Sequence, residues 1–159
     1  MKKITVAVDS FKGSLSSQEV ADAFEVGAKR VLPHCEVRKV SVADGGEGTV
    51  DALVQMLDGE YVTPVVADPL MRPIEARYGI VDGGRVAVME MSAASGLPLL
   101  KPEERNPLKT TTYGTGEMIA DALRRGCRKF LIGIGGSATN DAGVGMLRAV
   151  GFRFLDSKG

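Results

Sequence analysis

Apolar residues follow two different periods along the chain, and the order in which these periods alternate predicts the order of its elements. Residues 4–8 form a short apolar run, as in a buried strand. Ser16 and Glu19 then match the capping-box pattern that begins many helices. Four apolar positions at helical spacing follow before Pro33: Val20, Phe24, Ala28 and Val31. The first third of the chain therefore begins with a strand, a loop and a helix.

The same unit occurs a second time. Residues 37–42 again read as a strand, the glycine-rich loop ADGGEG follows, and residues 50–57 give an apolar helix that ends near Gly59. Such alternation predicts an α/β fold with parallel strands and helical crossovers. Ligands in these folds usually bind beyond the carboxyl ends of the strands, and both polar loops, DSFKGSLS and ADGGEGT, lie there.

From about residue 60 the pattern changes. The segments YVTPVVAD, PIEARYGIVDGG and RVAVMEM predict antiparallel strands, with Asp82–Gly83–Gly84 as a hairpin turn. A charged, proline-bearing stretch, KPEERNPLK, predicts an exposed connection. The strand–helix alternation then returns, with a helix over 116–125, a strand over 129–134, a short helix over 146–150 and a strand over 152–155.

Composition limits the functional classes. The 159 residues are 44% hydrophobic and carry 20 basic and 20 acidic side chains, so the chain can form a core and has no net charge. No block of like charges indicates a nucleic-acid or membrane surface, and few aromatic residues are present to stack on bases. The apolar runs are too short to cross a bilayer, and no signal peptide precedes Asp9, which predicts a cytoplasmic protein. Cys35 and Cys127 have no metal-ligand spacing and are expected to be reduced thiols.

One stretch concentrates candidate chemistry. Residues 131–145, LIGIGGSATNDAGVG, pass from an apolar strand into a loop in which glycines mix with Ser137, Thr139, Asn140 and Asp141. Glycines allow the backbone to approach a ligand closely, and successive N–H groups followed by a helix start favour an anion such as phosphate. The alternative is a tight turn at Gly135 and Gly136 with Asn140 or Asp141 capping the helix.

Three loops of this kind occur in the chain: DSFKGSLS, ADGGEGT and GGSATNDAG. Together they strengthen the hypothesis of a polyanion site, because each one joins small hydrogen-bonding residues to a carboxylate after a strand. Lys12 has the charge to neutralise a phosphate or a substrate carboxylate, although a solvated surface lysine is the alternative. Asp9, Asp44 and Glu47 have the chemistry to bind Mg²⁺ or to accept a hydroxyl proton, whereas a carboxylate at a strand end is as often a cap.

Standard nucleotide signatures leave one competing hypothesis. The chain contains neither a GxxxxGK[ST] phosphate loop nor the HRD and DFG motifs of protein kinases. Gly133, Gly135 and Ala138 fit the G-x-G-x-x-A pattern of dinucleotide-binding domains, and Asp156 stands where a ribose-binding acid is expected, so an NAD-dependent dehydrogenase is an alternative. Polar residues 139–141 argue against it, because the crossover helix should begin there. A non-catalytic phosphometabolite-binding domain is a third possibility.

Five motifs in order, VAVDSFKGSLSS, VADGGEGT, EMSAASGL, RNPLKTTTYGTGE and IGIGGSATNDAGVG, resemble those of the bacterial-type glycerate kinases, which phosphorylate D-glycerate from ATP. The similarity covers essentially the whole chain, but members of that family are much longer, so only their N-terminal part is resembled. Ala142 stands where the family often has a second glycine after the Asn-Asp pair, which predicts an ordinary φ at that residue.

The resemblance implies a flavodoxin-like or Rossmann-like parallel α/β domain with an inserted second α/β domain, both incomplete in this chain. Residues 1–66 would begin the first domain and 67–159 would belong to the second, with the active site in the cleft. It also implies ATP and Mg²⁺ as cofactors, D-glycerate as substrate and in-line transfer of the γ-phosphoryl group. Oligomeric state is left open.

The candidate site residues follow from the motifs and the resemblance together. Lys12, Asp44, Glu47 and Asp141 are the catalytic candidates, and Asp44 and Glu47 are also the metal candidates. Substrate or phosphate binding is expected from Asp9, Ser10, Lys12, Ser14, Gly45, Gly46, Thr115, Gly135, Gly136, Ser137, Thr139 and Asn140. Weaker candidates are Ser92, Ser95, Thr111, Thr112 and Glu117, because these residues would serve equally well as caps or strand ends.

Overall fold

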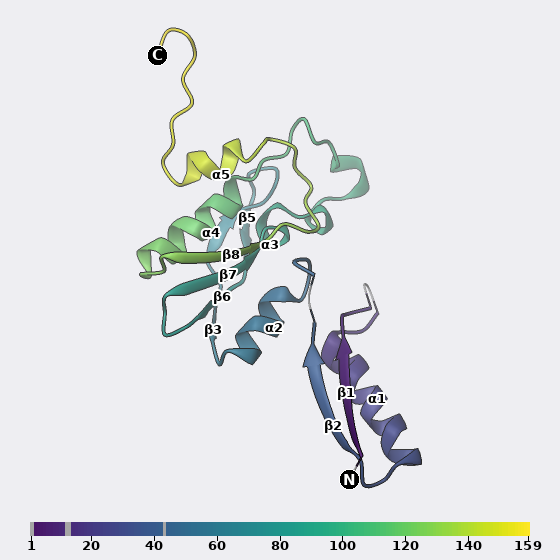
Figure 1. Cartoon of the computed structure of the whole chain (residues 1–159). Coiled ribbons are helices and arrows are strands. Elements are labelled where there is room, and N and C mark those ends of the chain that lie inside the picture. Colours follow the sequence, from purple (N-terminus) through teal and green to yellow (C-terminus); the bar gives the residue numbers. More distant parts are fainter. Residues whose placement is uncertain (1, 12–13, 43) are drawn as a thin grey trace. The chain divides into compact units, whose positions relative to one another are not determined.

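The computed structural model describes residues 2–11, 14–42 and 44–159. Its contacts divide the chain into two compact units, Met1–Asp44 and Gly45–Gly159, and each is described by itself. Figure 1 labels the elements along the chain, and their bounds are β1 (Lys3–Val8), α1 (Ser17–Val31), β2 (Glu36–Ser41), α2 (Thr49–Met56), β3 (Glu60–Val62), β4 (Val65–Ala67), β5 (Pro73–Glu75), β6 (Tyr78–Val81), β7 (Val86–Glu90), α3 (Ser92–Ser95), α4 (Tyr113–Arg124), β8 (Lys129–Gly133) and α5 (Val144–Ala149), with 3₁₀ turns η1 (Leu97–Leu99) and η2 (Pro102–Glu104).

The first unit is a single strand–helix–strand motif. β1 and β2 pair in parallel, from Lys3 opposite Glu36 to Val8 opposite Ser41, and α1 connects them. The predicted capping box is present: the Ser16 hydroxyl accepts a hydrogen bond from the N–H of Glu19, whose carboxylate accepts one from the N–H of Ser16 at 2.7 Å. The first βα unit predicted from the sequence is therefore confirmed.

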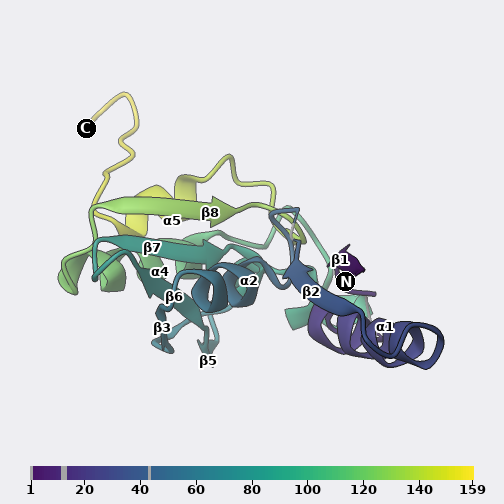
Figure 2. The same ribbon diagram turned by 60° about the horizontal axis from the view of Figure 1, so that its bottom comes forward.

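The second unit is built on a four-stranded sheet in the order β3-β6-β7-β8. β3, β6 and β7 are antiparallel neighbours, and β8 joins β7 in parallel after the α4 crossover. Figure 2 shows β8, β7 and β6 following one another across this sheet. A separate antiparallel pair is formed by β4 and β5. The predicted change to antiparallel strands after residue 60, and the later return to strand–helix alternation, are both confirmed.

The sheet is buried on both faces, and β7 shows this by the alternation of its side chains. Val86 and Val88 pack with residues of α2, whereas Ala87 and Met89 pack with residues of α4. The helix after the ADGGEG loop thus covers one face of the sheet, and the later crossover helix covers the other. Because β7 and β8 are parallel neighbours in this sheet, the two loops that follow these strands begin side by side.

Two expectations about elements were wrong. No strand forms over 152–155, where Phe152, Phe154 and Leu155 are all more than half exposed. Their alternation resembles a strand, but a strand needs a neighbour, and this segment extends away from the sheet (Figure 1). The helix expected over 116–125 begins earlier, at Tyr113, because residues 113–116 are held against neighbouring elements rather than left as a turn.

The predicted domain boundary at residues 66 and 67 concerns the longer relatives and stays a prediction. Among the described residues, no helix is long and apolar enough to cross a membrane. Both cysteines are free and buried, as expected for reduced thiols.

Candidate functional site

Two of the three predicted glycine loops lie side by side at the end of β8. The N–H of Gly135 donates to the carbonyl oxygen of Gly45 at 3.2 Å. A Cβ atom placed on Gly133 would lie 2.3 Å from that same oxygen, which is too close for any side chain. Glycine at position 133 is therefore required by the approach of the other loop. The sequence predicted a shared site for these loops, and here their backbones touch.

The loop after β8, residues 134–143, is held to its surroundings by backbone hydrogen bonds. The carbonyl oxygen of Gly136 accepts from Leu97 N–H at 2.9 Å, and the N–H of Ala138 donates to the carbonyl oxygen of Ser95 at 2.9 Å. The hydroxyl of Thr110 donates to the carbonyl oxygen of Ala138 at 2.7 Å. These bonds tie the loop to the EMSAASGL and TTT segments, so three of the five motifs converge on it.

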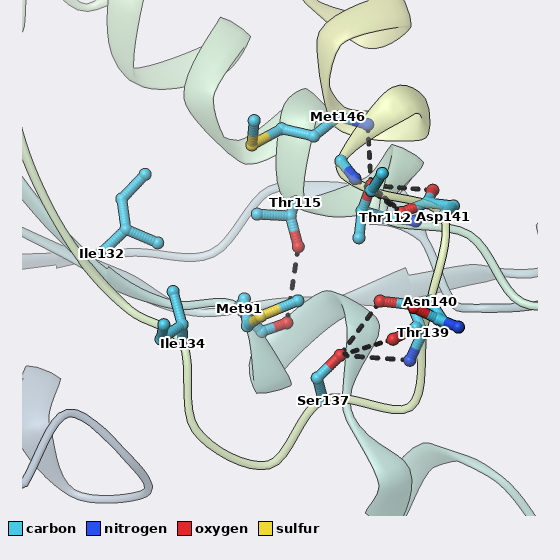
Figure 3. Close-up of a pocket in the computed structure, with 12 residues that line it drawn as sticks. Met91, Thr112, Thr115, Ile132, Ile134, Ser137, Thr139, Asn140, Asp141 and Met146 are labelled. Carbon is cyan, nitrogen blue, oxygen red and sulfur yellow. Dashed lines mark hydrogen bonds between the residues drawn. The ribbon is translucent and has the colours of Figure 1, made fainter. Parts of the chain in front are cut away.

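Asp141 joins the end of the loop to the start of α4. Its carboxylate accepts from the N–H of Thr112 at 2.9 Å and from the N–H groups of Gly143 and Gly145, each at 3.1 Å. The hydroxyl of Thr112 lies within hydrogen-bond distance of both carboxylate oxygens, and the same hydroxyl oxygen accepts from Met146 N–H at 2.9 Å (Figure 3). Asp141 and Thr112 therefore form one junction between two helices.

The electrostatics of Asp141 follow from these donors. Burial raises the pKa of Asp141, but the N–H and hydroxyl of Thr112 and the N–H groups of Gly145 and Gly143 together hold it below the ordinary value. The carboxylate is thus ionised near neutral pH, and donors already surround it. Asp141 therefore acts as a cap for α5, because it accepts from N–H groups at the start of that helix. From the sequence, N–H groups at this helix start were expected to bind phosphate.

Ala142 corrects one prediction. An ordinary φ was expected because the residue has a side chain, yet φ is +52°, in the left-handed region. The hydrogen bonds of Asp141 to Gly143 and Gly145 bend the chain at this point and impose that conformation. Left-handed backbone is unfavourable for an L-residue by about 1–2 kcal/mol.

Replacing Ala142 with glycine is therefore expected to raise the free energy of unfolding by about 0.5–1 kcal/mol, since glycine removes the clash but gains freedom in the unfolded chain. Urea unfolding measures this change. Ala52→Gly, in the interior of α2, is the matched control and should lower stability by about 1 kcal/mol. A loss of stability in Ala142→Gly equal to that of the control would contradict the prediction.

A cavity of about 330 Å³ opens beside this loop. Apolar side chains of Met91, Ile132 and Ile134 lie on one side of it, and polar side chains of Thr139, Asn140 and Asp141 lie on the other (Figure 3). Its lining contains no Lys, Arg or His from the described residues. An anionic ligand at this loop would thus need its charge balanced by a bound cation or by a basic side chain from elsewhere.

Several backbone donors of the loop remain available. The N–H groups of residues 136, 137 and 140–142 donate no hydrogen bond to any residue in the part of the chain that the structure describes. Gly136, Ser137, Asn140 and Ala142 are also exposed. These successive donors form an arrangement suited to phosphate oxygens.

Other predicted side chains have partners within the protein. Thr115 lines the cavity but is 2% exposed, and its hydroxyl contacts the Ser95 hydroxyl at 2.7 Å and the carbonyl oxygen of Met91 at 3.4 Å. Ser137 and Thr139 bond to each other through their hydroxyls at 3.0 Å. Glu117 accepts from the N–H of Ala67 at 2.6 Å and so links α4 to β4. Thr115 and Glu117 therefore have structural roles in this state.

The N-terminal candidates lie in the first unit. Asp9 accepts from the N–H of Ser10 at 2.7 Å, and Ser14 donates its N–H to Phe11 at 2.8 Å, as in turns. Asp44 ends this unit, whereas Glu47 is exposed in the loop of the second unit, between Gly45 and α2. Lys12 lies outside the described residues. Within the described ranges, no three His, Cys, Asp or Glu side chains gather as a metal site.

One residue beside the contact between the two glycine loops was not predicted from the sequence. Glu90 ends β7 opposite Gly133, and its carboxylate accepts from the N–H of Val50 at 2.9 Å. The available signal was its place in EMSAASGL: an acidic side chain directly after a buried apolar strand is costly unless it has partners.

The dehydrogenase hypothesis has no support in this geometry. Asp156 lies in the exposed segment after α5, where it accepts from Lys158 N–H, and no strand precedes it. Asn140 and Asp141 do not begin a long crossover helix, because Asp141 bonds to Thr112 and the helix that follows, α5, spans only Val144–Ala149.

Comparisons with known proteins agree with this arrangement of motifs. The sequence profile of the Glycerate kinase family matches residues 4–159. The chain is 54% identical over 157 residues to the glycerate kinase of Bacillus subtilis (strain 168), and 48% identical over 157 residues to the glycerate 2-kinase of Escherichia coli (strain K12). Each alignment covers 99% of this chain and 41% of the relative, so the chain spans about two fifths of the length of these relatives.

A solved structure extends the comparison to three dimensions. The crystal structure assigned to glycerate kinase 2 of Salmonella typhimurium LT2 superposes with a TM-score of 0.86 at 49% identity, covering 99% of this chain and 42% of the other. With the family profile matched from residue 4 to residue 159, the chain belongs to the Glycerate kinase family.

Proposed function

We propose that the protein containing this chain is a glycerate kinase that transfers the γ-phosphoryl group of ATP to a hydroxyl of D-glycerate. The observation that supports this most directly is the contact between the two glycine loops, because Gly45 and Gly135 meet just beyond the carboxyl end of β8, and α/β proteins bind ligands at such strand ends. The family match supplies the reaction class.

The loop after β8 is proposed to bind phosphate through its backbone. The N–H groups of residues 136, 137 and 140–142, which have no acceptor among the described residues, are uncharged donors, so they would orient phosphate oxygens but leave the phosphate charge unbalanced. Asp141 adds a negative charge nearby. A divalent cation or a basic side chain from elsewhere would balance this charge, and we propose MgATP as the nucleotide and Lys12 as the side chain.

Mg²⁺ is proposed to be held by Asp44 or Glu47 together with the phosphates. Few protein ligands suffice for this ion, because it usually keeps several waters and shares one or two carboxylates with a phosphate chain. The absence of a larger acidic cluster among the described residues is compatible with such a site. When bound, Mg²⁺ would neutralise charge on the transferred phosphoryl group.

The proposed role of each candidate residue follows from its contacts. Glu47, exposed beside Gly45 and Gly46, is proposed to serve the metal or to accept the glycerate hydroxyl proton. Asp141 is proposed to position the loop, because both its oxygens already accept hydrogen bonds. Asp9, Ser10 and Ser14 are proposed to bind substrate. Catalysis then depends mainly on positioning and charge neutralisation.

The overall architecture proposed for the protein is the one implied by its family. A flavodoxin-like domain would contain residues 1–66, among them β1, α1 and β2, and residues 67–159 would belong to an inserted α/β domain. The parallel β1–β2 pair supports the first part of this assignment. The enzyme is proposed to be cytoplasmic.

The test is ADP release measured with D-glycerate and MgATP, on the chain itself and on the full-length product of its gene. Glycerate-dependent turnover is expected in the full-length product and should disappear when EDTA removes Mg²⁺. Lys12→Ala is expected to lower kcat/KM about tenfold, the effect of losing one charge-assisted contact. Lys29→Ala, in α1, is the control and should leave turnover unchanged. A folded full-length protein without glycerate-dependent ADP release would disprove the proposed function.

A further inference from the structure

The loop Gly45–Gly48 has no side-chain cap of its own. Its last residue, Gly48, is the residue before α2, and no side chain within that loop bonds to the first turn of the helix. The acceptor comes from another element: the carboxylate of Glu90, at the end of β7, accepts from Val50 N–H at 2.9 Å. Glu90 thereby fixes the start of α2 to the central strand of the sheet.

The place of Glu90 in the sheet connects it to the second loop as well. Glu90 is the register partner of Gly133, and the N–H of the next residue, Met91, donates to the carbonyl oxygen of Gly133 at 2.9 Å. Gly133 is also the residue on which Gly45 packs. One strand end therefore fixes both glycine loops, with Glu90 holding the first through hydrogen bonds and β8 carrying the second.

This arrangement is electrostatically unfavourable for the fold. Burial and the charge of Asp51 raise the pKa of Glu90, while the N–H groups of Val50, Thr49 and Gly48 offset only part of that effect. A residue chosen for stability alone would be better as an uncharged acceptor at this half-buried position. A carboxylate at a position where an uncharged acceptor would be more stable, beside a loop proposed to bind ligand, indicates a functional constraint.

We infer that Glu90 is a positioning residue for phosphoryl transfer, which holds the backbone of residues 48–50 so that the neighbouring Gly45, Gly46 and Glu47 keep their places against the loop after β8. The inference rests on the proposed function for its kinetic consequence. The contact itself, from Glu90 to the first turn of α2, is independent of the reaction. Glu90 has no assigned contact with substrate and is therefore distinguished from Glu47.

The kinetic test compares Glu90→Gln with the wild-type full-length protein. Glutamine keeps an acceptor oxygen but loses the charge that strengthens the three N–H contacts. The variant is expected to lower kcat about tenfold with KM changed less than about twofold, and to melt at the wild-type temperature or above it. Glu75→Gln is the matched control, since Glu75 is an exposed carboxylate on β5, and it should change neither quantity.

A second measurement does not depend on activity. Hydrogen exchange of the amides of residues 48–50 is expected to be faster in Glu90→Ala than in the wild type, with exchange in β6 and β7 unchanged. A lower melting temperature with kcat unchanged, or unaltered exchange at 48–50, would overturn the positioning role. Wild-type protein without glycerate-dependent turnover would instead contradict the proposed function, while the exchange result would still decide whether Glu90 holds the loop.

Discussion

Replacing Gly133 with alanine is expected to reduce kcat/KM of the full-length protein at least about a hundredfold. The added Cβ would lie 2.3 Å from the carbonyl oxygen of Gly45 and 2.9 Å from its carbonyl carbon. Neither loop can yield by rotating a side chain, because both contacting atoms belong to the backbone. The loops must separate, and misplacement of catalytic groups by about 1 Å is enough for such a loss.

Steady-state ADP release measures this effect, and circular dichroism confirms that the sheet remains. Gly27→Ala, in the interior of α1, is the control because its added Cβ would meet no atom within 4 Å. This control should keep full activity and gain about 0.5–1 kcal/mol of stability, as expected for alanine in a helix. Activity of Gly133→Ala within a factor of two of the control would show that loop contact does not matter for the reaction.

Removal of the Asp141 carboxylate is expected to lower the free energy of unfolding substantially. Asp141→Ala leaves the N–H groups of Thr112, Gly143 and Gly145 without their acceptor, and hydrogen bonds to a charged group contribute about 1.5–3 kcal/mol each. Because solvent can reach part of the site, we expect a total loss of about 3 kcal/mol in the free energy of unfolding, measured by urea titration.

The pH dependence of this loss separates the charge from the shape of the side chain. The pKa of Asp141 is lower in the folded state, so its ionised form contributes stability that is present above the unfolded value of about 3.9 and disappears as pH falls through the folded value. The stability difference between wild type and Asp141→Asn should therefore be largest near neutral pH and shrink below about pH 4. A difference independent of pH would contradict the charge argument. Asp156→Asn, in the exposed segment after α5, is the control and should change stability little.

The parts of the fold that were predictable are those specified by neighbouring residues. The capping box at Ser16 and Glu19, the hairpin turn at 82–84 and the strand over 129–133 depend on local pattern, and all three are present. The shared site of the loops at Gly45 and Gly135 was expected from their common composition, although the strands that precede them, β2 and β8, belong to different sheets.

The remaining features depend on partners that are distant in sequence. Alternation at 152–155 predicted a strand, but only a neighbouring strand could complete it. The hydroxyl contact between Thr115 and Ser95, 20 residues apart, could not be predicted from local pattern either, and phosphate binding by Thr115 stays a prediction. The contact between Glu90 and Val50 likewise arises from a tertiary bond that no local pattern encodes. The left-handed φ of Ala142 instead follows from bonds of Asp141 within the next four residues.

The anchoring of the loop at residues 134–143 has a consequence for the thermodynamics of ligand capture. Hydrogen bonds to Leu97, Ser95 and Thr110, and the Asp141 junction, order this segment when the chain folds. Nucleotide association should therefore involve little loss of conformational entropy from this segment, and its rate should not be limited by an ordering step. Calorimetry would show this as a small unfavourable entropy and a heat-capacity change no larger than burial of the ligand itself requires.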